Sequence, residues 1–330
     1  MLTKPRRAYT ARDLAFVVPT KDRPQKVGNL LESLSQQTEP CGRVIVIDGG
    51  QSVRDVVMAF ADRLPVEYRD CRPPGQIRQR NIGIGMIDAR TPLVGCLDDD
   101  IVFEPQAVKA MAAFWNSCES ETAGVSFNIV NTPPEPRSWL RDLFFLSGPG
   151  PGRVLPSGMA TSNCQAQTNL RTQWLCDGAT VWRHEILNRF PHREVRSRWA
   201  IGEDVIFSYP IGKQFPLYVC ADARVRHEHQ ADYVSRMRHR FHGRTQTMWM
   251  FYFVESNQDL SRLAFLWMVL GTIVARSVMG ALTLQRSHIE FGWGQIEGVA
   301  KSLTAVLRGA DIVTILEELG DDDRRALGAG

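Results

Sequence analysis

The stretch LVGCLDDD, residues 93–100, runs from five apolar or small residues directly into three consecutive aspartates. Its first part predicts a buried strand, and Asp98, Asp99 and Asp100 predict the polar end of that strand. Adjacent carboxylates repel one another, so burying them requires a compensating cation. Because alternate residues of an extended chain point the same way, Asp98 and Asp100 share one side. A hard divalent ion, Mg²⁺ or Mn²⁺, shared with a diphosphate would satisfy them, and a solvated acidic turn is the alternative.

The first hundred residues alternate between strand and helix patterns. Strands are predicted at 14–19, 43–48 and 66–68, and helices after Pro24, at 56–64, at 77–87 and after Pro105. Such a βαβ series predicts a mostly parallel sheet with helices on both faces, which binds ligands beyond the carboxyl ends of its strands. Asp48, the loop 20–23 and the three aspartates all lie at such ends.

Composition narrows the class of protein. The chain has 330 residues, of which 44% are hydrophobic and 23% charged, with a net charge of +3. These values predict a folded protein with one large α/β domain and an extension, and they give nucleic-acid binding no support. The seven scattered cysteines favour reduced thiols over a disulfide framework. The polar, basic N-terminus argues against export, so the expected location is the cytoplasm.

The second half is less regular. Residues 131–172 are rich in Pro, Gly, Ser, Thr and Asn and predict a long loop or binding segment. Arginines crowd between 224 and 244, with His227 and His229 among them, which indicates either phosphate contacts or a solvated helix face. The uncharged run 263–275 is shorter than the roughly 20 residues that span a bilayer. Extension through Arg276 would cost about 2.5–3.5 kcal/mol near the helix centre, so an interfacial or buried helix is favoured over a spanning one.

Several motifs occur together in a fixed order. They are Val18–Arg23 (VPTKDR), Val46–Gly50 (VIDGG), Gly75–Gly83 (GQIRQRNIG), Leu97–Asp100 (LDDD), Asp177–Ala179 (DGA) and Gly202–Asp204 (GED). In this order and spacing the chain resembles the family 2 glycosyltransferases over residues 14 to about 230. The resemblance implies a GT-A fold, a mixed, mostly parallel sheet with helices on both faces, followed here by a helical C-terminal extension.

The resemblance also implies a division of the chain. Residues 1–12 would be an N-terminal extension and residues 13–231 the catalytic domain, with a nucleotide-binding half at 13–118 and an acceptor half at 119–231. Beyond the resemblance, the arginine-rich and apolar stretches predict a helical region at 232–319, associated with the inner face of the cell membrane, and the small, acidic end predicts a flexible tail at 320–330.

Roles follow from the resemblance residue by residue. The nucleotide-sugar donor would contact a set of strand-end and loop residues: Pro19, Thr20, Asp22, Arg23, Asp48, Gly75, Arg80, Asp98 and Asp99. Asp100 would bind Mn²⁺ or Mg²⁺ together with a histidine, for which His227 is preferred and His229 stays open. Asp204 would be the catalytic base. Asp177, Gly178, Glu203 and His229 would lie at or behind the acceptor site.

The chemistry agrees with these roles. Sugar transfer needs a neutralised leaving diphosphate and a deprotonated acceptor hydroxyl, which a metal ion and a carboxylate can provide. Direct attack with one base predicts inversion at the anomeric carbon. The expected acceptor is a glycan or a lipid-linked sugar, as in polysaccharide synthesis for a cell envelope. Two alternatives stay open: a nucleotidyltransferase, disfavoured because no glycine-rich phosphate loop precedes a lysine, and a non-catalytic membrane-associated scaffold.

Overall fold

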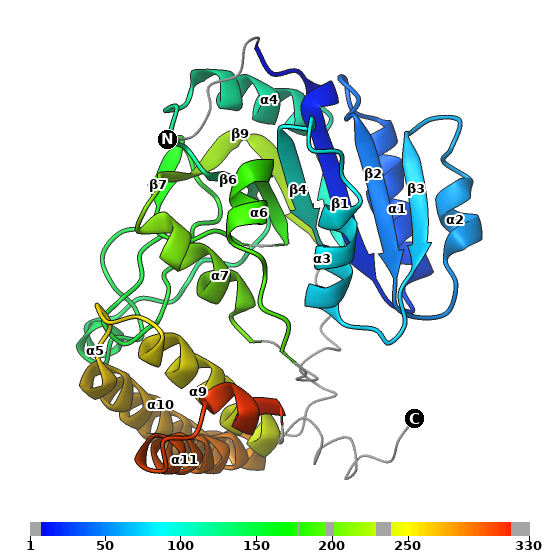
Figure 1. Cartoon of the computed structure of the whole chain (residues 1–330). Helices are drawn as coiled ribbons and strands as arrows, with labels where there is room; N and C mark the ends of the chain where they lie inside the picture. The colour runs from blue at the N-terminus through cyan, green and yellow to red at the C-terminus, as the bar shows by residue number, and fades with distance from the viewer. Residues whose placement is uncertain (1–7, 177, 196–200, 229–238, 318–330) are drawn as a thin grey trace. The chain divides into compact units, whose positions relative to one another are not determined.

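The computed structural model describes residues 8–176, 178–195, 201–228 and 239–317 (Figure 1). The chain divides into two compact units. The first, here called the sheet unit, comprises Met1–Pro134, Ser162–Glu194 and Phe207–His229. The second, the helical unit, comprises Glu135–Thr161, Val195–Ile206 and Gln230–Gly330. Parts of the predicted loop 131–172 thus belong to each unit.

The sheet unit is built on one mixed sheet. Its strands are β1 (Leu14–Thr20), β2 (Arg43–Asp48), β3 (Val66–Asp70), β4 (Leu93–Leu97), β5 (Ile101–Phe103), β6 (Gly124–Ile129), β7 (Leu170–Thr172), β8 (Ala179–Arg183) and β9 (Leu217–His227). The order is β3-β2-β1-β4-β8-β6-β9-β5, with β7 beside β9. The strands β3, β2, β1 and β4 run parallel, so their carboxyl ends meet at one edge.

Alternation along the strands separates two apolar layers. One face carries Phe16 and Val46 and packs against α1 (Pro24–Ser35), α2 (Arg54–Met58) and α4 (Ala107–Ser117). The other carries Val17 and Ile45 and packs against α3 (Gln76–Gly85) and α6 (His184–Arg189). Because both faces are covered, β1 and β2 are buried almost throughout. The predicted α/β fold with helices on both faces is confirmed.

Two predicted elements differ in detail. The helix predicted at 56–64 begins at Arg54 and ends at Met58, and turns follow it as far as Arg63. Pro65 disfavours helical geometry at Leu64, the last residue of the predicted range. The predicted loop 131–172 contains a short helix, α5 (Trp139–Leu143), and the strand β7. Ser138 begins α5 because its side chain accepts a hydrogen bond from the backbone N–H of Arg141.

The helical unit contains α9 (His239–Glu255), α10 (Arg262–Thr283) and α11 (Arg286–Leu307). Their apolar core includes Phe251, Phe265 and Met268. The helices α9 and α11 pack backbone to backbone: a Cβ on Gly294 would lie 1.9 Å from the carbonyl oxygen of Arg240. Helix α7 (Glu203–Gly212) begins in the helical unit and ends in the sheet unit.

Two glycines of α3 provide a matched test of how closely this helix packs on β1. A Cβ on Gly83 would lie 2.3 Å from a methyl carbon of Val17 on β1, whereas one on Gly85 would meet no atom within 4 Å. We expect Gly83→Ala to lower the free energy of unfolding by about 1–3 kcal/mol, because overpacking forces α3 off the sheet. Gly85→Ala should leave it unchanged or raise it by up to about 1 kcal/mol through helix propensity. Urea unfolding measures both, and equal effects would contradict this packing.

Candidate active site

Asp98 begins the acidic run directly after β4. Its backbone N–H donates to the carbonyl of Gly178 at 2.8 Å, and its Oδ1 accepts hydrogen bonds from Arg80 Nη2 at 2.8 Å and Gln76 Nε2 at 3.1 Å. The side chain of Arg80 is only 1% exposed, so the carboxylate of Asp98 forms an ion pair with a buried guanidinium from α3. A Cβ on residue 178 would lie 2.3 Å from Oδ2 of Asp98, so the close approach of the two segments requires glycine at position 178.

Asp99 is the buried member of the run. Its Oδ2 accepts from Thr20 Oγ1 at 2.7 Å and its Oδ1 from Arg23 Nη1 at 2.9 Å. Burial raises the pKa of Asp99 to about 6, although Arg23 and Thr20 act in the opposite direction. Through these two hydrogen bonds, Asp99 connects the end of β1 and the loop after it to the end of β4, and it fixes the position of the Arg23 guanidinium.

Asp100 pairs with His227, which comes from far along the chain. β5 pairs antiparallel with β9 so that Ile101 lies opposite His227, and this places Nε2 of His227 2.9 Å from Oδ1 of Asp100. Burial alone would raise the pKa of Asp100 and lower that of His227. The hydrogen bond and charge between them outweigh burial, so the pKa of Asp100 is lowered and that of His227 is raised. Arg23 lies 3.6 Å from the other oxygen of Asp100.

Together these side chains form a cluster that can hold a metal ion. One ligand atom each from Asp98, Asp100 and His227 lies within 4.8 Å of the others. Two carboxylates and an imidazole are ligands that Mn²⁺ accepts. The sequence predicted Asp100 and His227 as metal ligands and Asp98 as a donor contact, and the structure brings all three together.

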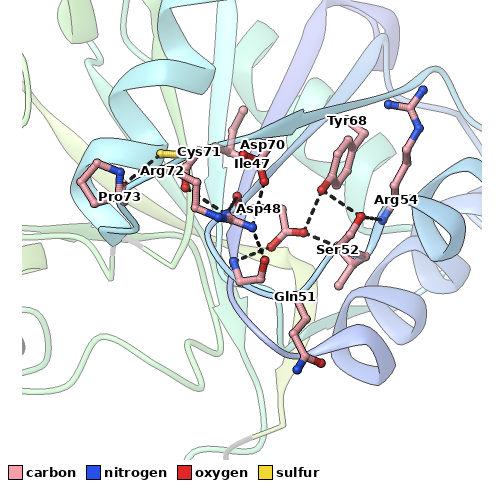
Figure 2. Close-up of polar contacts among 12 residues, drawn as sticks. Ile47, Asp48, Gln51, Ser52, Arg54, Tyr68, Asp70, Cys71, Arg72 and Pro73 are labelled. Carbon is pink, nitrogen blue, oxygen red and sulfur yellow. Dashed lines mark hydrogen bonds and ion pairs between the residues drawn. The ribbon is translucent and has the colours of Figure 1, made fainter. Parts of the chain in front are cut away.

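Asp48, at the end of β2, is fully buried. Figure 2 shows its carboxylate surrounded by donors: Oδ1 accepts from the backbone N–H of Gly50 at 2.8 Å, and Oδ2 from Val53 N–H at 3.0 Å and Tyr68 Oη at 2.9 Å. Its hydrogen bonds fix the turn that follows β2 and orient Tyr68, whose hydroxyl also contacts Ser52. The predicted contact of Asp48 with a base or ribose stays a prediction.

The loop after β1 is tied to the loop after β2. Asp22 adopts the left-handed region, with φ 57°, and its Oδ1 accepts from the backbone N–H of Gln51 at 2.6 Å. Aspartate tolerates this conformation better than most residues. Pro19 is buried within β1, opposite Ile47 of β2.

The start of α3 is clamped to the same strand ends by Gln79. Its Nε2 donates to the carbonyls of Thr20 and Ile47, at 2.8 and 2.6 Å, and its Oε1 accepts from the backbone N–H of Gly75 at 3.2 Å. These bonds join Thr20 and Gly75, two of the predicted donor residues, to the end of β2 directly before Asp48.

The predicted acceptor residues are described in part. Asp177 and His229 lie outside the described residues. Glu203 and Asp204 begin α7 and belong to the helical unit, where Oδ1 of Asp204 accepts from the backbone N–H of Val205 at 2.9 Å. The role of Asp204 as base stays a prediction.

Four residues of the site were missed from the sequence. Gln76 and Gln79 stand inside a motif from which only Gly75 and Arg80 were chosen, so the motif itself was the available signal. Tyr68 gave no signal beyond its place in a strand. Asn131 donates to and accepts from the backbone of His227, each at 2.9 Å, and its segment predicted only a loop.

The hydrogen bonds of the buried Asp48 carboxylate predict that its replacement lowers the stability of the fold. In Asp48→Asn an amide N–H₂ would face the N–H groups of Gly50 or Val53, leaving a buried donor without an acceptor. We expect the free energy of unfolding to fall by about 1–3 kcal/mol. The exposed Asp55 serves as control, and Asp55→Asn should change it by less than about 0.5 kcal/mol. Denaturant titration without nucleotide decides this, and equal values for the two variants would refute it.

Two solved structures of other proteins have the same fold as this chain. Mannosyltransferase PcManGT from Pyrobaculum calidifontis, in complex with GDP-Man and Mn²⁺, aligns with a TM-score of 0.54 at 14% identity, over 91% of this chain and 90% of that chain. Residues 1–349 of S. aureus TarS, in complex with UDP-GlcNAc, align with a TM-score of 0.50 at 15% identity, over 90% and 92%. At such identities the likeness shows a shared fold, GT-A. No curated protein matched the chain by sequence.

The family follows from a separate match. The model described as glycosyl transferase family 2 covers residues 15–189, more than half of the 330-residue chain, and includes the strand ends that carry Thr20, Asp48 and the acidic run. This chain therefore belongs to glycosyl transferase family 2, the family that its motifs resemble.

Proposed function

We propose that this enzyme transfers a sugar from a nucleoside-diphosphate sugar to a hydroxyl of a glycan or lipid-linked acceptor, with inversion, and that it depends on a divalent cation. The observation that carries the proposal is the cluster of Asp98, Asp100 and His227 at the carboxyl end of β4. Ligands of open α/β sheets bind at this end of the strands. The family and the nucleotide-sugar complexes of the two similar structures support the donor class.

The donor set suits Mn²⁺ or Mg²⁺, with carboxylate oxygens from two aspartates and one imidazole nitrogen. The Mn²⁺ in the mannosyltransferase complex supports the same class of ion. When bound, such an ion supplies Lewis-acid stabilisation of the leaving diphosphate. Asp98, Asp100 and His227 would hold it.

The chain's own cations would complete the donor site. Arg23 is 40% exposed while its guanidinium is held by Asp99, so it can turn a free N–H toward a phosphate without losing its anchor. Arg80 is only 1% exposed and donates to Asp98, so it positions that carboxylate. A planar guanidinium binds phosphate oxygens through paired hydrogen bonds. The exposed Arg23 would therefore stabilise negative charge that develops on the leaving group.

The acceptor hydroxyl needs a base. We assign that role to Asp204, on the family resemblance of the Gly202–Asp204 motif and its position at the first turn of α7. While the carboxylate takes the hydroxyl proton, the acceptor oxygen attacks the anomeric carbon from the face opposite the diphosphate, and the bond from that carbon to the diphosphate breaks. Inversion is the stereochemical consequence of that single displacement.

The assay for the reaction class uses a panel of nucleotide sugars with candidate acceptors. Release of a nucleoside diphosphate, dependent on Mn²⁺ or Mg²⁺, is the expected result. Release of pyrophosphate would support a nucleotidyltransferase instead, and absence of turnover with every donor and acceptor class would support a scaffold.

Loss of Asp100 should uncouple nucleotide binding from the metal. In Asp100→Ala we expect the affinity for UDP or GDP in the presence of Mn²⁺ to fall at least about tenfold, with little change in EDTA, because a ligand of the ion is gone. Asp88→Ala, which removes an exposed aspartate paired with Arg90, is the control and should bind as wild type. Isothermal titration calorimetry measures both, and an unchanged Mn²⁺-dependent affinity for Asp100→Ala would remove the metal assignment.

Loss of Asp204 should affect chemistry and spare donor binding. Asp204→Asn keeps the shape of the side chain but cannot accept the proton, so kcat should fall about 10²–10⁴-fold with the donor Kd unchanged. The exposed Asp62 gives a matched control in Asp62→Asn. A kcat for Asp204→Asn within a few-fold of the Asp62→Asn value would show that another group is the base.

A further inference from the structure

The outer side of α10 is apolar along its whole length. Its exposed large side chains include Leu263, Trp267, Leu270, Val274, Val278 and Leu282, with exposed fractions of 41–80%. Their spacing of three or four residues places them on one side of the helix. The opposite side packs into the core of the helical unit through Phe265, Met268 and Val269. A continuous apolar stripe of this kind marks an interaction surface.

Helix α5 extends this surface. Trp267 of α10 stacks on Phe144 with ring centroids 4.8 Å apart, and its indole Nε1 donates to the carbonyl of Leu143 at 2.9 Å. The neighbouring side chains Trp139, Leu140 and Leu143 are 73%, 49% and 51% exposed. A Cβ on Gly271 would lie 2.3 Å from Phe144, so the two segments are in close contact.

The charged residues within α10 and at its ends are arginines. From Arg262 to Ile289 the sequence contains three arginines and no acidic residue. Arg262 and Arg286 flank the ends of α10 and are exposed, and Arg262 pairs with Glu255 of α9. Arg276 is turned away from the stripe, with its guanidinium carbon 3.8 Å from the ring centroid of Phe291 on α11. The stripe itself therefore carries no charge, and Arg286 is an exposed cation beyond its C-terminal end.

We propose that the α5–α10 surface docks on a lipid bilayer that contains anionic headgroups. Apolar side chains with tryptophans at the boundary and arginines at the rim suit the interface between acyl chains and headgroups. The exposed guanidinium of Arg286 beside an uncharged stripe complements anionic headgroups, which favours a bilayer with anionic lipids as the occupant. This proposal is independent of the transfer chemistry.

The helix lies along the bilayer surface rather than across it. α10 is, by length and composition, one described helix that could cross a membrane, and 33% of its most apolar window is buried in the fold. α11 packs beside α10, with Ile289 and His288 against Gly280. α11 carries Glu290, Glu297 and Lys301, which a spanning arrangement would carry into hydrocarbon at high cost.

Vesicle flotation of the purified full chain tests the proposal. The wild type should float with phosphatidylcholine vesicles that contain phosphatidylglycerol and much less with phosphatidylcholine alone. Val274→Glu puts a charge in the stripe and should reduce binding at least about tenfold, since each tenfold corresponds to about 1.4 kcal/mol. Met58→Glu, on α2 of the sheet unit, is the matched control, because Met58 and Val274 are 43% and 49% exposed. It should float as wild type.

Four results would overturn the proposal, of which the last is retention in alkaline carbonate. The first is wild-type protein that stays with the buffer in the presence of anionic vesicles. The second is equal flotation of Val274→Glu and Met58→Glu, checked with equal melting temperatures so that unfolding is excluded. The third is a dimer in light scattering that Val274→Glu dissociates, without vesicle binding, which would assign the surface to a second copy. Bound protein should also be released by alkaline carbonate, and retention would mean that α10 crosses the bilayer.

Discussion

The structure depends on how three consecutive carboxylates are held within a few ångströms at the carboxyl end of β4. Each has a different partner: Arg80 for Asp98, Arg23 and Thr20 for Asp99, and His227 for Asp100. These partners come from three separate elements, so the mutual repulsion of the aspartates is balanced only when the sheet is assembled. Of these cationic side chains, the exposed Arg23 is the one that would contact a diphosphate in the proposed site. The requirement for charge balance therefore links folding to the predicted donor site.

The strand ends were predictable because they follow from short-range patterns. Apolar runs set the bounds of β2 and β4 at the predicted residues, and parallel strands bring Thr20 and Asp48 into register at one edge. What could not be predicted depends on pairing between distant segments. Nothing local in the sequence indicates that β9 pairs with β5, the pairing that places His227 beside Asp100. Nor does it indicate that Asn131 forms hydrogen bonds with the backbone of His227. The buried hydrogen bond from Tyr68 to Asp48 is similarly a product of tertiary packing.

The two units carry different sets of the proposed functional residues. The sheet unit holds the residues assigned to the donor, and its hydrogen bonds fasten three loops to one sheet edge through Asp99, Gln79 and Asp22. The helical unit supplies Asp204 and the apolar stripe of α10. Its helices α9 and α11 are in close contact at Gly294, and one side of α10 is exposed in the part of the chain that the structure describes. A membrane surface would concentrate an acceptor with a lipid anchor, which is how the two proposals would meet.

The most direct measurement of the central claim is anomalous diffraction from crystals grown with Mn²⁺ and a nucleoside diphosphate. We expect a manganese peak among Asp98, Asp100 and His227 when the nucleoside diphosphate is bound. The claim would be contradicted by a bound nucleotide with no anomalous peak at this edge of the sheet, and with His227 still paired to Asp100 alone.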